Sequence, residues 1–266
     1  MDINRLKKLT ENPDFIPGIY NYCDRWCERC QFTSRCMNFA LSEEHFDDPD
    51  SHNVKNEAFW RKLGEVFQLT RQMIEESAAK WGIDLDSLDL QAAEKEIETR
   101  RENAESHECA LASMSYVEKV KSWFESAGDI FQQKEDELNT EAQLDLPGSE
   151  PAAEAATIGD AVEVIRWYQY FIQAKLLRAV GGAVEETADP PDEYPRDSDG
   201  SAKIALIAMD RSIAAWGRMY KHFPEHQSDI LDVLVLLERL RGRTQTSFPN
   251  ARAFVRPGFD DVAQAD

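Results

Sequence analysis

The fold depends most on residues 158–180, IGDAVEVIRWYQYFIQAKLLRAV, which place apolar side chains on most faces of a helix. A helix that is apolar nearly all round is buried among other elements. Thr157, with Asp160 three residues later, predicts the N-terminus of this helix. Gly181 and Gly182 predict its C-terminus. We therefore expect the central helix of a bundle.

Four further helical regions surround this helix in the sequence. Residues 54–81 repeat apolar side chains at steps of three and four, and Gly82 follows the pattern. Residues 88–142 predict one long helix or two with a break, and 201–222 and 225–242 predict two more. No run of β-branched residues alternates with polar ones, so we expect no strand. The expected fold class is all-α, a bundle of about five helices.

Charge divides the chain into segments. The formal net charge is −20, but residues 1–40 hold six basic and five acidic residues. We expect three parts: an irregular, cysteine-rich metal-binding segment (1–50) and an irregular tail (245–266), both packed on a helical bundle (51–244). Such acidity repels nucleic-acid phosphates and anionic lipids, so we expect no nucleic acid and no membrane as partners, and a protein partner instead.

The C-terminal end is basic, in contrast to the rest of the acidic chain. From Arg239 to Phe259 the chain carries five arginines and no acid. We expect these arginines, with nearby phenylalanines, to hold the tail against the acidic body. A site for an anion or a partner is the alternative.

Targeting signals are not evident in the sequence. The N-terminal residues lack the apolar run of a secretory signal, and no stretch approaches the roughly 18 apolar residues of a membrane span. We therefore expect a cytoplasmic protein. Thiols stay reduced in that compartment, where clustered cysteines indicate metal binding before they indicate disulfides.

The clustered cysteines are Cys23, Cys27, Cys30 and Cys36, in the stretch YNYCDRWCERCQFTSRC, with the spacing C-x3-C-x2-C-x5-C. Four thiolates this close can converge on one centre. Structural zinc usually takes two short-spaced pairs separated by a longer linker, which this compact run lacks. It is more similar to the four-cysteine runs that hold a [4Fe–4S] cluster, although its spacing departs from the bacterial ferredoxin pattern. We expect an iron–sulfur cluster, with Zn²⁺ as the alternative; structural cysteines or two disulfides are the remaining interpretation.

The first three cysteines also resemble the C-x3-C-x2-C triad of radical-SAM enzymes. That resemblance covers three residues and implies a βα barrel with one open iron position. The sequence shows no βα repeat, and Cys36 can fill the fourth position. We therefore do not expect radical-SAM chemistry.

Charged and aromatic residues surround these cysteines. Three arginines alternate with them: Arg25, Arg29 and Arg35. Guanidinium groups offset the negative charge of a thiolate centre and raise its reduction potential. Four aromatic residues can shield the centre or dock the segment onto the bundle: Tyr20, Tyr22, Trp26 and Phe32.

A second candidate site lies in the helical region. Glu163 and Asp210 occupy largely apolar helical stretches, and His107 continues an apolar stripe. Buried carboxylates need partners, so we expect structural ion pairs, with an active site formed by the three residues as the alternative. The expected basic partners are Arg166 for Glu163, and Lys203 or Arg211 for Asp210.

The remaining candidates are weaker. Cys109 lies in the apolar stretch ECALASM, so we expect it in the core. His222 and His226 are four residues apart, but Pro224 breaks the helix between them, and we expect a surface pair.

These observations lead to three functional hypotheses. The first is electron transfer or redox sensing by an iron–sulfur cluster. The second is a zinc-stabilised helical scaffold for protein–protein interaction. The third is an enzyme with a site in the helical bundle, served by the cysteine centre.

Overall fold

The computed structural model describes residues 8–45, 53–144, 147–185 and 196–260. Within these ranges the protein is built from helices, turns and loops without a strand, which confirms the all-α prediction. No helix in them is long and apolar enough to cross a membrane. The chain separates into two compact units, Met1–Glu96 with Val255–Asp266, and Ile97–Phe254.

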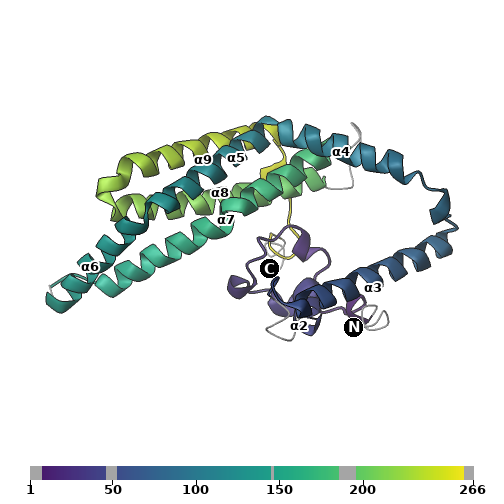
Figure 1. The fold of residues 1–266 in the computed structure, drawn as a ribbon, viewed down its shortest axis with the longest axis horizontal. Helices are drawn as coiled ribbons and strands as arrows, with labels where there is room; N and C mark the ends of the chain where they lie inside the picture. Colours follow the sequence, from purple (N-terminus) through teal and green to yellow (C-terminus); the bar gives the residue numbers. More distant parts are fainter. Residues whose placement is uncertain (1–7, 46–52, 145–146, 186–195, 261–266) are drawn as a thin grey trace, which may run out of the picture. The chain divides into compact units, whose positions relative to one another are not determined.

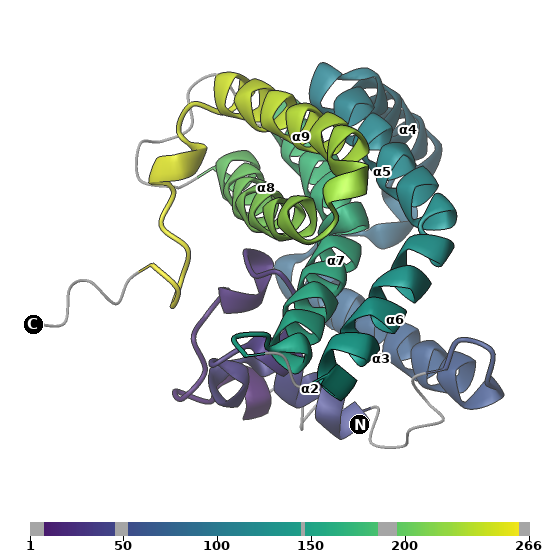
Figure 2. The same cartoon turned by 90° about the vertical axis from the view of Figure 1, so that its left-hand side faces the viewer.

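The second unit is a four-helix bundle with an extension. It consists of α5 (Glu108–Ser126), α7 (Pro151–Glu185), α8 (Asp197–His222) and α9 (Gln227–Ser247). α5 packs against α7 and α9, and α8 packs against the same two helices, so the four close a ring (Figures 1 and 2). α6 (Gly128–Leu144) packs on α7 beyond the ring. The short connection from α8 to α9 makes these two helices antiparallel.

α8 contributes more buried residues to this bundle than the other described helices do. Small side chains at Ala202, Ala205 and Ala208 are fully buried, which lets α7 approach closely. Farther along, the buried Trp216 meets Trp123 of α5 edge to face, with 5.0 Å between the ring centroids. The predicted central helix α7 therefore shares the middle of the core with α8.

α7 is longer at both ends than the sequence predicted. Thr157 lies inside the helix, where its hydroxyl donates a 2.8 Å hydrogen bond to the carbonyl four residues earlier. Gly181 and Gly182 continue the helix, and neither adopts a positive φ. Both predicted ends were wrong, because a capping residue and two glycines fit inside a helix that tertiary packing stabilises.

The region 88–142 divides into α4 (Leu90–Ser106), α5 and α6, so the described chain has more helices than expected. The first break falls at His107, whose Nδ1 accepts a 3.1 Å hydrogen bond from the Cys109 amide and caps α5. Histidine is not among the preferred N-cap residues, so this break could not be located from the residue types alone.

The first unit contains α2 (Met37–His45) and α3 (Glu57–Trp81). α3 confirms the predicted helix. The Asn56 side chain caps its start by accepting from the Ala58 amide at 3.0 Å, and Gly82, at φ 69°, ends it in the left-handed region. α2 corrects the expectation that residues 1–50 are irregular throughout, as do three short 3₁₀ turns.

The C-terminal tail divides between the two units. α9 continues to Ser247, and Phe248, Ala251 and Phe254 are buried in the bundle unit. From Val255 onward the chain belongs to the first unit. The predicted domain boundaries at residues 50 and 245, and the packing of segment 1–50 on the bundle, stay predictions.

Candidate metal centre

The four clustered cysteines line one cavity in the first unit. Cys23, Cys27, Cys30 and Cys36 are all free and partly exposed. The cavity volume is about 20 Å³, within about 320 Å³ of protein-free space that includes open solvent. The structure thus brings together the residues that the sequence singled out; their role as metal ligands stays a prediction.

Tight turns between the cysteines bring them together. Arg25 adopts φ 60°, a left-handed conformation that reverses the chain between Cys23 and Cys27. Two 3₁₀ turns follow, η2 (Cys27–Arg29) and η3 (Thr33–Arg35). The turns close with hydrogen bonds from the Cys30 amide to the Cys27 carbonyl (3.1 Å) and from the Cys36 amide to the Thr33 carbonyl (3.2 Å). Each turn therefore ends at a cysteine.

Apolar side chains form most of the remaining wall. Of the four aromatic residues expected around the centre, all but Tyr22 line the cavity. The apolar lining residues are Ile19, Tyr20, Trp26, Phe32, Phe39 and Phe259. Such a wall limits the access of water, one of the factors that sets a cluster's potential.

Three apolar lining residues were missed by sequence reasoning, namely Ile19, Phe39 and Phe259, and Phe259 is the one distant in the sequence. It lies in the C-terminal segment (residues 255–260) and meets Phe32 edge to face, with 5.0 Å between ring centroids. Gly258, at φ 75°, lets this segment approach Ile16 and Ile19 because it has no Cβ. A Cβ there would lie 2.9 Å from Cδ1 of Ile16 and 3.0 Å from Cδ1 of Ile19. Only the phenylalanines of the tail hinted at packing, and nothing in them pointed to the cysteines.

Local polar contacts hold the C-terminal segment in shape. Nη2 of Arg256 lies 2.9 Å from Oδ1 of Asp260, and its backbone amide donates to the same carboxylate at 2.9 Å. The guanidinium also lies over the Phe259 ring, 4.8 Å from its centroid. These contacts orient the ring that lines the cavity.

Two of the four thiols, those of Cys23 and Cys27, have a raised pKa. Burial raises the pKa of Cys23, and the nearby Arg25 charge opposes this effect. Burial also raises the pKa of Cys27, and the charges of the other three cysteines add to the rise. These repulsions show that the four sulfur atoms share one electrostatic environment, so thiolates there would require a cation to compensate them.

The three interleaved arginines differ in their contacts. Arg25 acts on Cys23, whereas Arg29 lies over the Trp26 ring, 4.0 Å from its centroid, and Nε of Arg35 donates to the Asp14 carbonyl at 3.5 Å. Arg25 is therefore the arginine placed to offset thiolate charge. In addition, the Phe32 amide donates to Cys30 Sγ at 3.4 Å.

The described ranges contain no group of three or more His, Cys, Asp or Glu side chains that could hold a metal ion, and this includes the four cysteines. The same finding holds for the acidic and histidine residues of the bundle, and it gives no support to a carboxylate metal site there.

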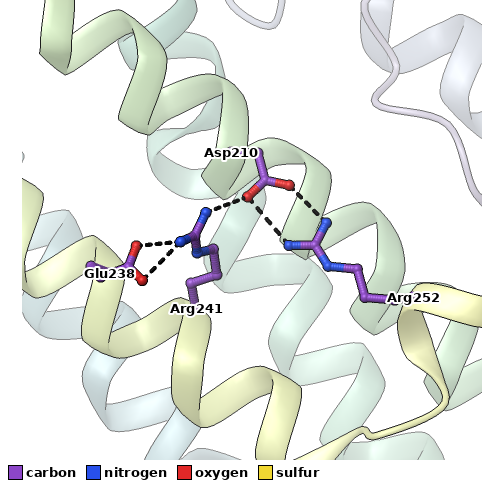
Figure 3. Close-up of polar contacts among 4 residues, drawn as sticks. All are labelled: Asp210, Glu238, Arg241 and Arg252. Atoms are coloured by element: carbon purple, nitrogen blue, oxygen red, sulfur yellow. Dashed lines mark hydrogen bonds and ion pairs between the residues drawn. The ribbon is translucent and has the colours of Figure 1, made fainter.

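Asp210 forms a structural ion network, shown in Figure 3. Its Oδ1 lies 3.0 Å from Arg241 Nη1 and its Oδ2 lies 2.7 Å from Arg252 Nη1. Glu238 contacts the same Arg241 at 2.7 Å. Burial alone would raise the pKa of Asp210, but the two guanidinium groups outweigh it and lower the pKa. Arg252 therefore links the tail to α8, whereas Arg241 belongs to α9 and Arg256 pairs with Asp260 of its own segment.

The expected partners of Asp210 were wrong. Lys203 donates instead to the Phe254 carbonyl at 2.5 Å, and Arg211 donates to the Tyr168 hydroxyl at 2.5 Å. The residues that bind Asp210 lie 31 and 42 positions away in the sequence. Helical spacing identifies neighbours on one helix only, so it could not have found them.

The other candidate residues have local roles. Glu163 is exposed on α7, and His107 caps α5. Cys109 is fully buried, as predicted; burial raises its pKa, and its Sγ lies 3.5 Å from Ser247 Oγ. His222 is not the surface residue expected, because its Nδ1 lies 3.1 Å from Oε1 of the half-buried Glu154.

Comparison of the chain with protein-family models, with curated proteins and with solved structures finds no match in any of the three. The cysteine cavity is therefore the basis for the proposed function.

Proposed function

We propose that Cys23, Cys27, Cys30 and Cys36 bind an iron–sulfur cluster, of the [4Fe–4S] type, and that the protein acts in electron transfer or redox sensing. The observation that carries the proposal is the convergence of four free thiols on one cavity with apolar walls. Thiolates are the usual ligands of such clusters.

The spacing of the cysteines in the sequence is the reason to propose a cluster before a single ion. A [4Fe–4S] cluster takes one thiolate at each of its four iron atoms, so its ligands stand around a volume. A zinc ion instead draws four sulfur atoms to about 2.3 Å from one point. Structural zinc usually takes two short-spaced pairs separated by a longer linker, and the compact run Cys23, Cys27, Cys30 and Cys36 has no such separation.

The surroundings of the cysteines suit a redox centre. The Arg25 charge and the hydrogen bond to Cys30 Sγ both stabilise added negative charge, and so favour the reduced cluster. The cysteines are partly exposed, which gives a redox partner or an oxidant access to the edge of the centre.

Zinc is the alternative, and the small cavity favours it. A volume of about 20 Å³ is close to that of one water-sized occupant. In that case the metal would stabilise the N-terminal segment as part of an interaction scaffold, without redox chemistry.

Metal analysis of protein purified without oxygen separates the two. We expect brown protein with broad visible absorbance and about four iron and four acid-labile sulfide per chain. A reversible change of the visible and electron paramagnetic resonance spectra during a redox titration would support the redox role. Colourless protein with one zinc per chain would overturn the cluster proposal.

Cysteine substitutions locate the centre. Cys27→Ser and Cys36→Ser should each lose most of the bound iron, because serine is a poor ligand for these clusters. Cys109→Ala is the matched control; it removes the fifth thiol, which lies outside the cavity, and should keep full iron content. Equal iron in Cys27→Ser and the native protein would rule out Cys27 as a ligand.

A further inference from the structure

An apolar groove lies along the C-terminal half of α3, away from the cysteine cavity. α3 forms one wall, and the segment that follows it, with the 3₁₀ turn η5 (Leu85–Ser87), forms the other. The groove has a volume of about 710 Å³. Its apolar lining residues include Met73, Ile74, Trp81, Ile83, Leu85 and Leu88. We call it the α3 groove.

The groove continues an apolar stripe along the whole helix. Trp60, Phe67, Ile74 and Trp81 recur every seven residues and are 60%, 65%, 54% and 77% exposed. At 1.5 Å per residue this stripe is about 32 Å long. Large side chains that recur on one helix face at the heptad interval are typical of a surface that contacts another helix.

Carboxylates border the groove on the side of the segment after α3. Asp84, Asp86 and Asp89 alternate with the groove-lining Ile83, Leu85 and Leu88 along this segment. From Lys80 to Lys95 the intervening residues include four acids and no base. The three aspartates are exposed. The apolar floor therefore has a negative rim.

We propose that the α3 groove binds an amphipathic helix of a partner protein, one with lysine or arginine flanking its apolar face. The apolar face would pack on the stripe through residues spaced three, four and seven apart, and the basic flank would meet the aspartates. Two copies paired in parallel through this face would bring their like-charged rims together, whereas an antiparallel pair would keep the rims apart. A second copy is therefore an outcome of the test, detected by the oligomeric state. This interaction is independent of the metal centre.

A synthetic amphipathic peptide of leucine and lysine, about 18 residues long, serves as the probe. Fluorescence anisotropy of the labelled peptide would measure its binding to the full chain. We expect saturable binding that weakens as salt is added, because the rim charges are exposed. A peptide of the same composition, scrambled to remove its apolar face, and a leucine–glutamate peptide should both bind far more weakly.

Two variants test the two parts of the groove. Ile74→Asp puts a charge in the apolar floor and should weaken binding by about a hundredfold; Ile74 is more than half exposed, so the variant should fold. Asp84→Asn/Asp86→Asn/Asp89→Asn should weaken it about fivefold to tenfold. Asparagine preserves the capping hydrogen bonds that Asp84 and Asp89 accept from backbone amides.

The matched control changes the same amount of charge elsewhere. Glu98→Gln/Glu102→Gln/Glu125→Gln neutralises three exposed acids of α4 and α5 and should leave binding nearly unchanged. Equal weakening by this control would mean that net charge alone attracts the peptide, which overturns the proposal. So would binding that survives Ile74→Asp, absence of binding to the native chain, or a native dimer that Ile74→Asp converts to monomer.

Discussion

The bundle and the cysteine segment reach order by different means. In the bundle, large side chains such as Tyr116, Leu176 and Trp216 are fully buried. In residues 8–36, all of which are described, Ile19 and Trp26 alone are buried. The comparison indicates that apolar burial is extensive in the bundle and sparse in the cysteine segment; if the proposed metal binds, it would add stability where burial is sparse.

Removing the metal is the strongest test of this contrast. The loaded protein is treated with an oxidant and a chelator to remove the metal. Residues 15–36 and 255–260 should then lose most of their hydrogen-exchange protection, because metal binding stabilises them in this proposal. The thermal transition of the bundle should move by less than about 2 °C. Exchange followed by mass spectrometry measures both parts. A segment that stays protected without metal would break the contrast.

A cavity in the bundle should have the opposite effect. Trp216→Ala removes a fully buried ring that contacts Trp123, and should lower the free energy of unfolding by about 3–5 kcal/mol. Urea denaturation followed by circular dichroism measures this loss. Metal content per folded chain should stay unchanged, and Trp81→Ala, which removes an exposed tryptophan, is the control with little effect on stability.

Gly258→Ala tests whether the C-terminal segment belongs to the metal centre. A Cβ at φ 75° and within 3.0 Å of two isoleucine side chains should cost about 1–3 kcal/mol and displace Phe259 from the cavity. We expect faster loss of the cluster in air, measured by the decay of visible absorbance, with no change in bundle unfolding. Gly148→Ala also lies at positive φ but has no atoms near its Cβ, and should leave cluster decay unaltered.

The smallest effect concerns the ion network of the bundle. Arg252 and Arg241 lower the pKa of Asp210 despite its burial, so its contribution to stability is complete above the unfolded-state pKa near 3.8. It is lost as the pH falls through the lower folded-state pKa. The side chain is 38% exposed, so the contribution should be about 1 kcal/mol or less. Asp210→Asn should flatten the acid limb of the stability curve; an unchanged limb would contradict this assignment.

Periodicity in the sequence was enough to place α3, α7, α8 and α9, because each has an apolar face whose spacing is a local property. The cysteine run was equally visible. Helix ends were harder to predict. The imidazole cap at His107 and the continuation of α7 past Gly181 depend on the packing around them.

Contacts between distant residues account for the rest. The arginines at 241 and 252 meet Asp210, and Phe259 closes a cavity built from residues near the other end of the chain. One sequence indicates which residues are apolar or charged, which cysteines are clustered, and where helices form, because these follow from side chains and their near neighbours. Which distant side chains meet depends on how helices pack and turns fold back, and that became apparent in three dimensions.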